Sequence, residues 1–521
     1  MSTAVGIDLG TSNSCVAAVI DGTPTVLADD GGRKTQPSVV AFGYAGMVVV
    51  GPRARQQLAF APDNTVYSVK RLIGRYFRSP EVERLKTHVS WGVAEGPNGD
   101  ARVRVQGKVY SAQEISGHVL KHMRKIAEDA TGGPVTAAVI TVPAYFNDQQ
   151  RQATRDAAHL AGLECLRILN EPTAAALAYG FGKGRRQNIV IYDLGGGTFD
   201  VSVLRIEDDV FEVISTAGDT FLGGDDFDSA IMDHLIDELN AIHHMELEFD
   251  PSARARLRDA AERAKIALTE SNSVEVRVPN LTRLRGTPIH LQSRLDRAAL
   301  GRLAFPLLEK TRLVCADALE QAGLHPSQID QILLVGGMTR SPPVREAVKR
   351  FFGKDPAAGL NPDEVVALGA AIQASNLTTF AAEDAPSSVL LDVTPQTLGI
   401  RTVGGFTEAL IPRNTSVPTE ASRVFNTAHD NQTTVRIQVY QGESKQAADN
   451  SLLGEFVLDG LPPAPRGKVR IRVTFAIDVD GITQVTARDE LSGRTQGIRI
   501  EGSTRLDPNE IDAMVLDEIA P

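Results

Sequence analysis

The sequence carries Asp193-Leu194-Gly195-Gly196-Gly197-Thr198-Phe199-Asp200 between two apolar runs, and the rest of the chain is arranged around this stretch. Residues 189–192 before it are apolar or aromatic. After it, apolar side chains alternate from Phe199 to Val203, which is the period of a β-strand. We therefore predict two strands joined by a glycine hairpin. Since no helix follows the glycines, the two common phosphate loops, which both precede a helix, are excluded.

The predicted turn has the groups that a phosphate and a hydrated cation need. Three glycines lack a Cβ atom, so a phosphate can reach the backbone N–H groups. Thr198 adds a hydroxyl, and Asp193 and Asp200 add carboxylates. An isolated match of this kind is more often an ordinary glycine-rich hairpin.

The same plan occurs a second time near the N-terminus. Residues 5–14 contain an apolar strand, then Asp8-Leu9-Gly10 and a hydroxyl-rich turn, and an apolar strand follows from Val16 to Ile20. Such a repeat predicts two similar halves, each of which presents a phosphate-binding hairpin to one shared cleft.

Composition limits the class of protein. The 521 residues are 42% hydrophobic and carry 54 basic against 65 acidic side chains, a net charge of −11, which argues against nucleic-acid and anionic membrane partners. Three cysteines without metal-binding spacing indicate a reducing compartment. No apolar run approaches the ~20 residues of a membrane helix, and no signal sequence is recognisable. We expect a cytoplasmic protein of about three or four domains.

Two side chains outside the hairpins are candidates for the cleft. Lys70 interrupts an apolar, strand-like pattern, so it is either a phosphate-facing cation or a side chain that reaches out to solvent. Glu171 opens a predicted helix with Pro172 in its first turn. Its carboxylate either favours the helix dipole or holds a metal-bound water. Before that helix, a buried strand ends at Pro143, and Asn147 with Gln150 forms a capping signature for a further helix.

Three later segments also carry candidate groups. A helix predicted over residues 253–270 places Glu262, Lys265 and Thr269 on one face, although polar side chains on one face are usually just solvated. The glycine-rich residues 218–226 are placed at the edge of the cleft. A third glycine turn, residues 336–343, precedes a helix predicted from 342 to 352, so its backbone and Arg340 could contact a base or ribose.

Together these motifs resemble the bacterial DnaK branch of the 70-kilodalton heat-shock chaperones, and several long motifs in the right order leave little room for chance. The resemblance implies an α/β actin-like, two-lobed ATPase domain followed by an all-β sandwich that binds peptides. It covers nearly the whole chain, through residues 5–16, 67–77, 140–153, 169–179, 191–202, 217–228 and 335–340.

The resemblance also implies roles for individual residues in binding ATP or ADP, Mg²⁺ and K⁺. Lys70 would stabilise charge on the γ-phosphoryl group, and Asp200 would lie near the monovalent cation. Asp8, Glu171 and Asp193 would hold hydrated magnesium, and Thr198 would join them in catalysis. The phosphates would be held by Gly10, Thr11, Ser12, Asn13, Gly195, Gly196, Gly197 and Thr198, and the adenosine by Glu262, Lys265, Thr269, Gly336, Gly337, Arg340 and Asp363.

The implied organisation has four parts: an ATPase domain (1–382), a linker (383–391), a β-sandwich (392–505) and the start of a helical lid (506–521). The linker signal is Val389, Leu390, Leu391 and Asp392, for which the alternative is simply the first strand of the next domain. Pro143 and Arg151 match the family's relay between the nucleotide and the outer domain. The family has a fourth apolar residue where this chain has Ser388, so we expect weaker docking of the linker.

The peptide-binding part rests on strand-like alternation from Thr434 onward and a hairpin turn at Asp480-Gly481. From the residues alone, the side chains assigned to the pocket would be core. Val403 replaces a larger residue of the family's arch. A short helix from Leu506 is marginal by itself, and the family's lid does not follow, so we expect a truncated or naturally lidless member. The matched pocket residues are Ile400, Val403, Phe425, Ala428, Val435, Ile437 and Ile471.

The resulting hypothesis is a monomeric, ATP-driven chaperone for unfolded polypeptides, with a J-domain co-chaperone and a GrpE-like nucleotide-exchange factor as partners. One alternative is a relative that does not cycle and acts as an exchange factor or scaffold, against which Lys70, Glu171 and Thr198 count. The other is a small-molecule kinase of the same superfamily, against which the β-sandwich counts.

Overall fold

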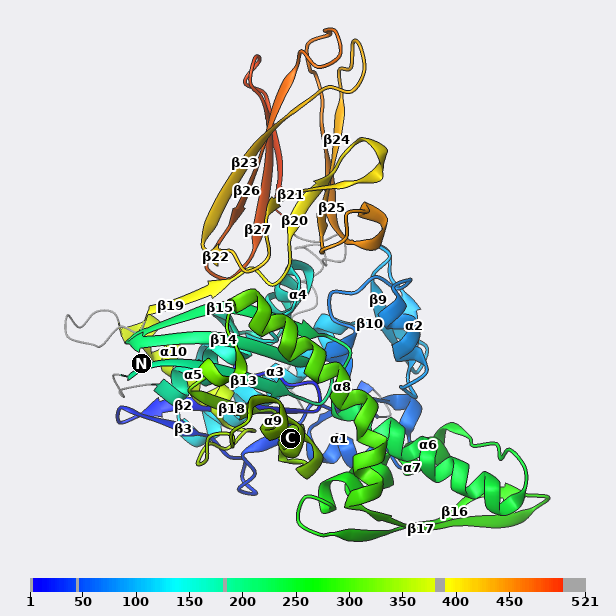
Figure 1. Cartoon of the computed structure of the whole chain (residues 1–521). Helices are drawn as coiled ribbons and strands as arrows, with labels where there is room; N and C mark the ends of the chain where they lie inside the picture. Colours follow the sequence, from blue (N-terminus) through cyan, green and yellow to red (C-terminus); the bar gives the residue numbers. More distant parts are fainter. Residues whose placement is uncertain (1–2, 44–45, 181–184, 380–388, 500–521) are drawn as a thin grey trace.

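A computed structural model describes residues 3–43, 46–180, 185–379 and 389–499 (Figure 1). Two mixed sheets flanked by helices form the N-terminal part, and two antiparallel sheets form the C-terminal part. Within these ranges, no helix is long and apolar enough to cross a membrane.

The first mixed sheet has the strand order β12-β11-β1-β2-β3, with β4 also paired to β2. β1 runs antiparallel to β2 and parallel to β11, with Asp8 opposite Cys15 and Thr141. Its strands are β1 (Thr3–Asp8), β2 (Asn13–Ile20), β3 (Thr23–Val26), β4 (Thr35–Pro37), β11 (Val135–Val142) and β12 (Glu164–Asn170).

The second mixed sheet has the order β18-β13-β14-β15-β19-β22. β13 runs antiparallel to β14 and parallel to β18, so it repeats the arrangement of β1, β2 and β11. Asp193 pairs with Asp200, and the Gly195 N–H donates to the Thr198 carbonyl (3.1 Å), which confirms the predicted hairpin. Its strands are β13 (Arg185–Leu194), β14 (Phe199–Asp208), β15 (Val210–Asp219), β18 (Gln331–Val335), β19 (Val389–Val393) and β22 (Ser416–Val417).

Helices α5 and α10 pack against each other and join the two sheets. An ideal Cβ on Gly369 would lie 1.8 Å from the Ala174 carbonyl oxygen, so only glycine allows the two helices to approach this closely. α3 and α4 contact the first sheet, and α8 contacts the second sheet and α9. The predicted cap at Asn147 and the predicted helix 342–352 are both confirmed. The helices are α3 (Ala112–Thr131), α4 (Asp148–Leu160), α5 (Glu171–Gly180), α8 (Arg297–Ala322), α9 (Pro342–Phe352) and α10 (Val365–Thr379).

Smaller elements cover the two sheets. The described part of residues 3–110 contains short helices and 3-10 turns as well as strands. Lys70 lies in a 3-10 turn, not in a strand, since the Ser68 and Arg71 side chains bond to Asp225 and Asp226 of the other half. These elements are α1 (Pro52–Gln57), α2 (Pro80–Lys86), η2 (Pro62–Asn64), η3 (Val69–Arg71), β5 (Val40–Phe42), β6 (Val48–Val50), β7 (Thr65–Val66), β8 (Gly92–Glu95), β9 (Ala101–Val105) and β10 (Lys108–Ser111).

The second half has its own outlying layer of two helices and a hairpin, at the lower right of Figure 1. The helix predicted over 253–270 ends at Ala267, so Thr269 lies just beyond it. The elements are α6 (Gly224–His243), α7 (Pro251–Ala267), β16 (Ser273–Leu284) and β17 (Thr287–Asp296), followed later by η4 (Pro326–Gln328) and η5 (Gly337–Arg340).

The C-terminal part consists of the sheets β21-β20-β24-β25 and β23-β26-β27-β28, which enclose one apolar core. The predicted turn at Asp480-Gly481 joins β26 to β27, with Gly481 at φ +77°. The elements are β20 (Leu398–Arg401), η6 (Val403–Gly405), β21 (Thr407–Ile411), β23 (Thr419–Asn426), β24 (Val435–Gln441), η7 (Ala447–Asp449), β25 (Ser451–Leu458), β26 (Arg470–Ile477), β27 (Thr483–Asp489) and β28 (Thr495–Arg499).

β19 connects the two parts. It pairs in parallel with β15, where Leu390 lies opposite Phe211, and in antiparallel with β22. The apolar residues 389–391 form part of a strand of the second mixed sheet. The two interpretations of this segment, as a linker and as a strand, therefore do not exclude each other. Leu390 packs against the core beneath α5, whereas the Leu391 side chain is 37% exposed. Ser388, the earlier linker residues and the predicted lid start lie outside the described residues.

The two leucines should differ in their effect on β19. Leu390→Asp places a charge against the core, so we expect faster amide hydrogen exchange in β19 by about tenfold or more. Leu391→Asp is the matched control and should leave the exchange rates almost unchanged. Equal acceleration in both variants would show that the apolar contact of Leu390 does not hold the strand.

Candidate functional site

A cleft of ≈330 Å³ lies where the two hairpin turns face each other. Almost every residue that the sequence assigned to phosphate, cation or adenosine lines it. The exceptions are Gly197, which packs against Thr11, and Asp200, which lies behind Asp193. The lining includes Asp8, Gly10, Thr11, Ser12, Asn13, Lys70, Glu171, Asp193, Gly195, Gly196, Thr198, Glu262, Lys265, Thr269, Gly336, Gly337, Arg340 and Asp363.

The glycine turns touch so closely that they leave no room for side chains. An ideal Cβ on Gly196 would lie 1.9 Å from the Ser12 hydroxyl oxygen of the first hairpin. On Gly223, which precedes α6, it would lie 2.5 Å from the Gly197 nitrogen. Gly336 combines a φ of +80° with a Cβ position 2.4 Å from the Leu194 carbonyl oxygen. Gly195, Gly196 and Gly336 of these turns line the cleft, so their backbone can contact whatever occupies it.

A lysine and a glutamate form the central ion pair of the cleft. The Lys70 Nζ donates to the Glu171 Oε1 at 2.6 Å, and both side chains are buried. The Lys70 ammonium also lies 5.5 Å from the centre of the Phe146 ring. Lys70 is thus held beside the hairpin turns and does not extend to solvent.

Three aspartates surround this ion pair. Burial, with the charge of Glu171 as the next cause, raises the pKa of Asp8 to about 7. Burial and the same neighbour raise the pKa of Asp193 well above its usual value and that of Asp200 to about 8. Asp8 accepts a hydrogen bond from Thr141 (3.2 Å), and Asp200 accepts one from the Tyr145 N–H (3.1 Å). One lysine cannot balance four carboxylates, so this region favours a cation.

Within the described ranges, no group of three or more His, Cys, Asp or Glu side chains is placed to hold one metal ion. A cation that keeps its own water shell fits this arrangement better, because Mg²⁺ in phosphate sites commonly keeps several waters. Asp8, Glu171 and Asp193 would then hold it through water.

The opposite side of the cleft is formed by α7 and the third glycine turn. Glu262 pairs with Arg55 of α1, which joins the two halves above the cleft. Lys265 pairs with Asp228 (2.9 Å). Arg340 pairs with Asp363 (2.7 Å) and is about half exposed, so it lies at the entrance.

Several lining residues were not assigned from the sequence. Asp228 follows Gly224 by one helical turn, and this spacing after a glycine pair was a usable signal. Cys15 is buried and also lines the cleft, and burial raises its thiol pKa. Three others, Ser14, Met338 and Ser341, lie in the turns predicted at residues 5–14 and 336–343. The sequence held no separate signal for Thr35, Ile266, Val335, Pro362 and Val366.

Comparison with protein families gives an extensive match: the family model described as Hsp70 protein matches residues 4–520. The chain belongs to the Hsp70 family. Members of the Hsp70 family are ATP-dependent chaperones and ATPases that bind ATP or ADP with Mg²⁺. They bind unfolded substrates and co-chaperones.

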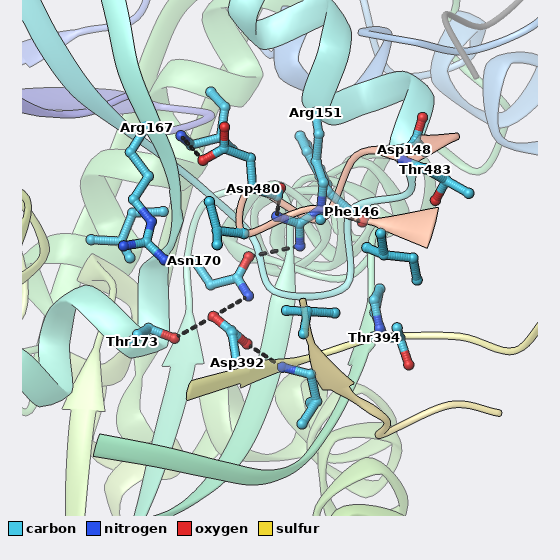
Figure 2. A pocket seen from close by; sticks show the side chains of 18 of the residues that line it. Phe146, Asp148, Arg151, Arg167, Asn170, Thr173, Asp392, Thr394, Asp480 and Thr483 are labelled. Atoms are coloured by element: carbon cyan, nitrogen blue, oxygen red, sulfur yellow. Dashed lines mark hydrogen bonds between the residues drawn. The ribbon is translucent and has the colours of Figure 1, made fainter. Parts of the chain in front are cut away.

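The two parts of this Hsp70 chain meet at a polar interface, shown in Figure 2. The Arg151 Nη2 donates to the Asn170 Oδ1 (2.7 Å), and the Asn170 Nδ2 donates to the Asp392 Oδ2 (2.7 Å). Asp480, in the β26–β27 turn, pairs with Arg155 of α4. A second contact joins Arg413 to Asp317 of α8 at 2.9 Å.

A continuous set of contacts runs from the cleft to this interface. Asp200 accepts from the Tyr145 N–H, and the Lys70 ammonium lies over the neighbouring Phe146 ring. The Arg151 guanidinium donates to the Phe146 carbonyl (3.2 Å) and the Ala144 carbonyl (3.1 Å). Pro143, at the start of this loop, accepts from the Phe146 N–H (3.1 Å). Residues 143–146 thus contact both the cleft and Arg151.

Asp148 is a buried interface carboxylate that forms no ion pair among the described residues. Its Oδ1 accepts from the Thr483 N–H (2.7 Å), whereas its Oδ2 is buried and has no hydrogen-bond partner among the described residues. Arg151, the nearest cation, bonds to backbone carbonyls and to Asn170 instead. Burial raises the pKa of Asp148 to about 7.

The residues assigned to the peptide pocket are only partly brought together. Ile400, Ile437 and Ile471 are buried in the C-terminal core, and Phe425 and Val435 pack against it. The Val403 side chain is 80% exposed and, like the half-buried Ala428, lies outside that core.

Two neighbouring glycines give a test of the close contact in the cleft. Gly223→Ala would push against the backbone of Gly196 and Gly197, so we expect nucleotide affinity to fall by about tenfold or more. Gly224→Ala is the matched control, because its Cβ would lie 3.2 Å from the end of the flexible Lys265 side chain and at ordinary contact distance, 3.6 Å, from the backbone of Gly195 and Gly196. Calorimetric titration with ATP measures both. Equal affinities, with unchanged melting temperatures, would contradict the proposed steric requirement.

The raised pKa of the buried Asp148 carboxyl leads us to expect that docking of the two parts depends on pH. A carboxyl with a pKa near 7 when docked and near 3.8 when exposed takes up a proton on docking. Docking should therefore weaken as pH rises from about 4 to 7 and then level off. Between pH 5.5 and 7.5 we expect a docking constant lower by roughly tenfold or more, read from the radius of gyration in X-ray scattering. Asp148→Asn, which keeps the acceptor for Thr483, should flatten the change, and an unchanged pH slope would contradict this assignment.

Proposed function

We propose that this protein is a chaperone of the DnaK branch that binds extended apolar peptides and uses ATP hydrolysis to control their release. The observation that carries the proposal is the buried Lys70–Glu171 pair (2.6 Å) beside two interlocked glycine hairpins. The organisation we propose is an actin-like, two-lobed ATPase domain (1–382), a linker (383–391), a β-sandwich (392–505) and the first part of a helical lid (506–521).

In this proposal the backbone N–H groups of the hairpins bind the phosphates, and Thr198 adds its hydroxyl. Bound Mg²⁺, held through water by Asp8, Glu171 and Asp193, would neutralise phosphate charge. Lys70 stabilises the charge that develops on the γ-phosphoryl group, because phosphoryl transfer depends on positioning and electrostatics. Glu171 orients Lys70 through their hydrogen bond. We propose Asp200 as the carboxylate nearest to a bound K⁺.

Nucleotide state would reach the peptide-binding sheets through residues 143–146, Arg151 and β19. A nucleotide shifts docking only if it binds the docked and undocked arrangements with different affinity. The contacts of Asp200 and Lys70 with Tyr145 and Phe146 supply such a difference. Val389, Leu390, Leu391 and Asp392 would then move with the sheets. The peptide would lie near the exposed Val403 and the half-buried Ala428.

The remaining proposals concern the setting in which the protein works. We propose a cytoplasmic monomer whose partners are unfolded polypeptides, a J-domain co-chaperone and a GrpE-like exchange factor. A non-cycling exchange factor or scaffold is not favoured, since it would not need the buried pair of Lys70 and Glu171.

ATP turnover measured with and without an unfolded apolar peptide tests the proposal. The parent protein should hydrolyse ATP faster with the peptide. Lys70→Ala should still bind ATP but lose hydrolysis by about 100-fold or more, because a transition-state contact is removed. Lys125→Ala, on the exposed face of α3, is the matched control and should behave as the parent.

Two results would oppose the proposal. Near-normal single-turnover hydrolysis by Lys70→Ala would remove this lysine from its role. Absence of peptide stimulation in the parent, with intact ATP binding, would favour the non-cycling alternative.

A further inference from the structure

The two halves of the N-terminal part repeat one arrangement of strands, but they differ at one position behind the cleft. In the first half, Asp8 of β1 lies opposite Thr141 of the parallel strand β11. In the second half, the corresponding pair is Asp193 of β13 and Val335 of β18. A hydroxyl therefore stands beside the first aspartate, where the second aspartate has an apolar side chain.

The Thr141 hydroxyl has Asp8 as its partner. It donates to the Asp8 Oδ1 at 3.2 Å, and Thr141 is 0% exposed. Within the described residues, neither this hydroxyl nor the Asp8 carboxylate makes another hydrogen bond. Burying a hydroxyl is unfavourable unless it is hydrogen-bonded, so the presence of Thr141 at this place is explained by Asp8.

Thr141 can act on a bound ligand only through this aspartate. Asp8 lines the cleft, whereas Thr141 is not among the lining residues. A carboxylate can turn about its last single bond, and a hydrogen bond to one oxygen restrains that rotation. The Asp8 Oδ2 is then left for a partner in the cleft, in the way that outer hydrogen bonds orient carboxylates at metal sites.

The second half orients its aspartate differently. Asp193 pairs across β13 and β14 with Asp200, a second acid, and has no hydroxyl beside it on β18. The corresponding neighbour of Asp8 across β1 and β2 is Cys15. Of these two aspartates, Asp8 alone thus has a neutral side-chain donor behind it.

We propose that Thr141 is a positioning residue for the cation: its hydroxyl fixes the Asp8 carboxylate so that the second oxygen is presented to the hydrated Mg²⁺ that accompanies the nucleotide. This inference rests on the role proposed above for Asp8. Thr141 itself contacts neither the nucleotide nor the cation.

The test is the Mg²⁺ dependence of ADP affinity, measured on the full chain by calorimetric titration in EDTA and at increasing free Mg²⁺. ADP is used because it binds without being hydrolysed. Thr141→Val keeps the shape of the side chain but removes the donor. We expect it to need about tenfold more Mg²⁺ for the same gain in ADP affinity, because outer partners of metal sites commonly contribute that much. Its ADP affinity in EDTA should equal that of the parent, since the glycine turns are unchanged.

Three further variants separate positioning from a structural role. Thr141→Ser keeps the hydroxyl and should restore the parental Mg²⁺ dependence, whereas Thr141→Ala lacks the donor and should behave as Thr141→Val. Thr311→Val is the matched control, because this buried threonine of α8 donates to the Leu308 carbonyl (2.8 Å) and lies outside the cleft. Electron paramagnetic resonance of Mn²⁺, added in place of Mg²⁺, gives a second readout of cation affinity.

Asp8→Asn distinguishes failure of this inference from failure of the proposed function. If Asp8→Asn keeps the parental Mg²⁺ dependence, the role proposed for Asp8 is wrong, and the inference falls with it. If Asp8→Asn loses that dependence while Thr141→Val keeps it, the inference alone is overturned. Equal losses in Thr141→Ser and Thr141→Val, or an equal loss of ADP affinity with and without Mg²⁺, would show a structural role and also overturn it.

Discussion

The shape of the cleft depends on a contact between three turns that is too close for any side chain at the two glycines involved. Ser12 of one hairpin, Gly196 of the other and Gly223 before α6 approach so closely that a single methyl group would collide with a hydroxyl or with backbone. Because these turns belong to different sheets, the contact fixes the relative position of both sheets. Both hairpins also line the same cleft, so the proposed phosphate chain could contact the backbone of both. In the same way, Gly369 of α10 lets this helix pack directly on Ala174 of α5, where a side chain would collide with backbone.

The acidic side chains in and behind the cleft outnumber the one basic side chain beside them. Asp8, Glu171, Asp193 and Asp200 face one buried lysine, and burial raises the pKa of the three aspartates. Such an arrangement is unfavourable by itself and becomes favourable when a cation enters. Ligand binding and cation binding should therefore support each other, since each removes a cost that the other would have to overcome.

Local signals explain what could be predicted from the sequence. The hairpin at 195–198, the cap at Asn147 and the helix 342–352 depend on neighbouring residues, and the structure has all three. Most cleft residues could be assigned because motifs carry them. Lys70 was placed in a strand because its apolar neighbours mimic one, whereas distant contacts of Ser68 and Arg71 hold a 3-10 turn. The pairing of β19 with β15 could not be predicted either, since nearly two hundred residues separate them.

The position of β19 has a consequence for the state in which the two parts separate. While it is paired, its backbone covers Val210, Phe211 and Glu212 of β15. When β19 leaves, that stretch becomes the open edge of the remaining four-stranded sheet β18-β13-β14-β15, with unpaired N–H and C=O groups, which is a template for any extended chain. If the two parts separate repeatedly, as proposed above, the protein must protect this edge from association with other strands. Glu212, whose carboxylate lies 3.3 Å from the Arg205 guanidinium, places charge on the edge and discourages such pairing.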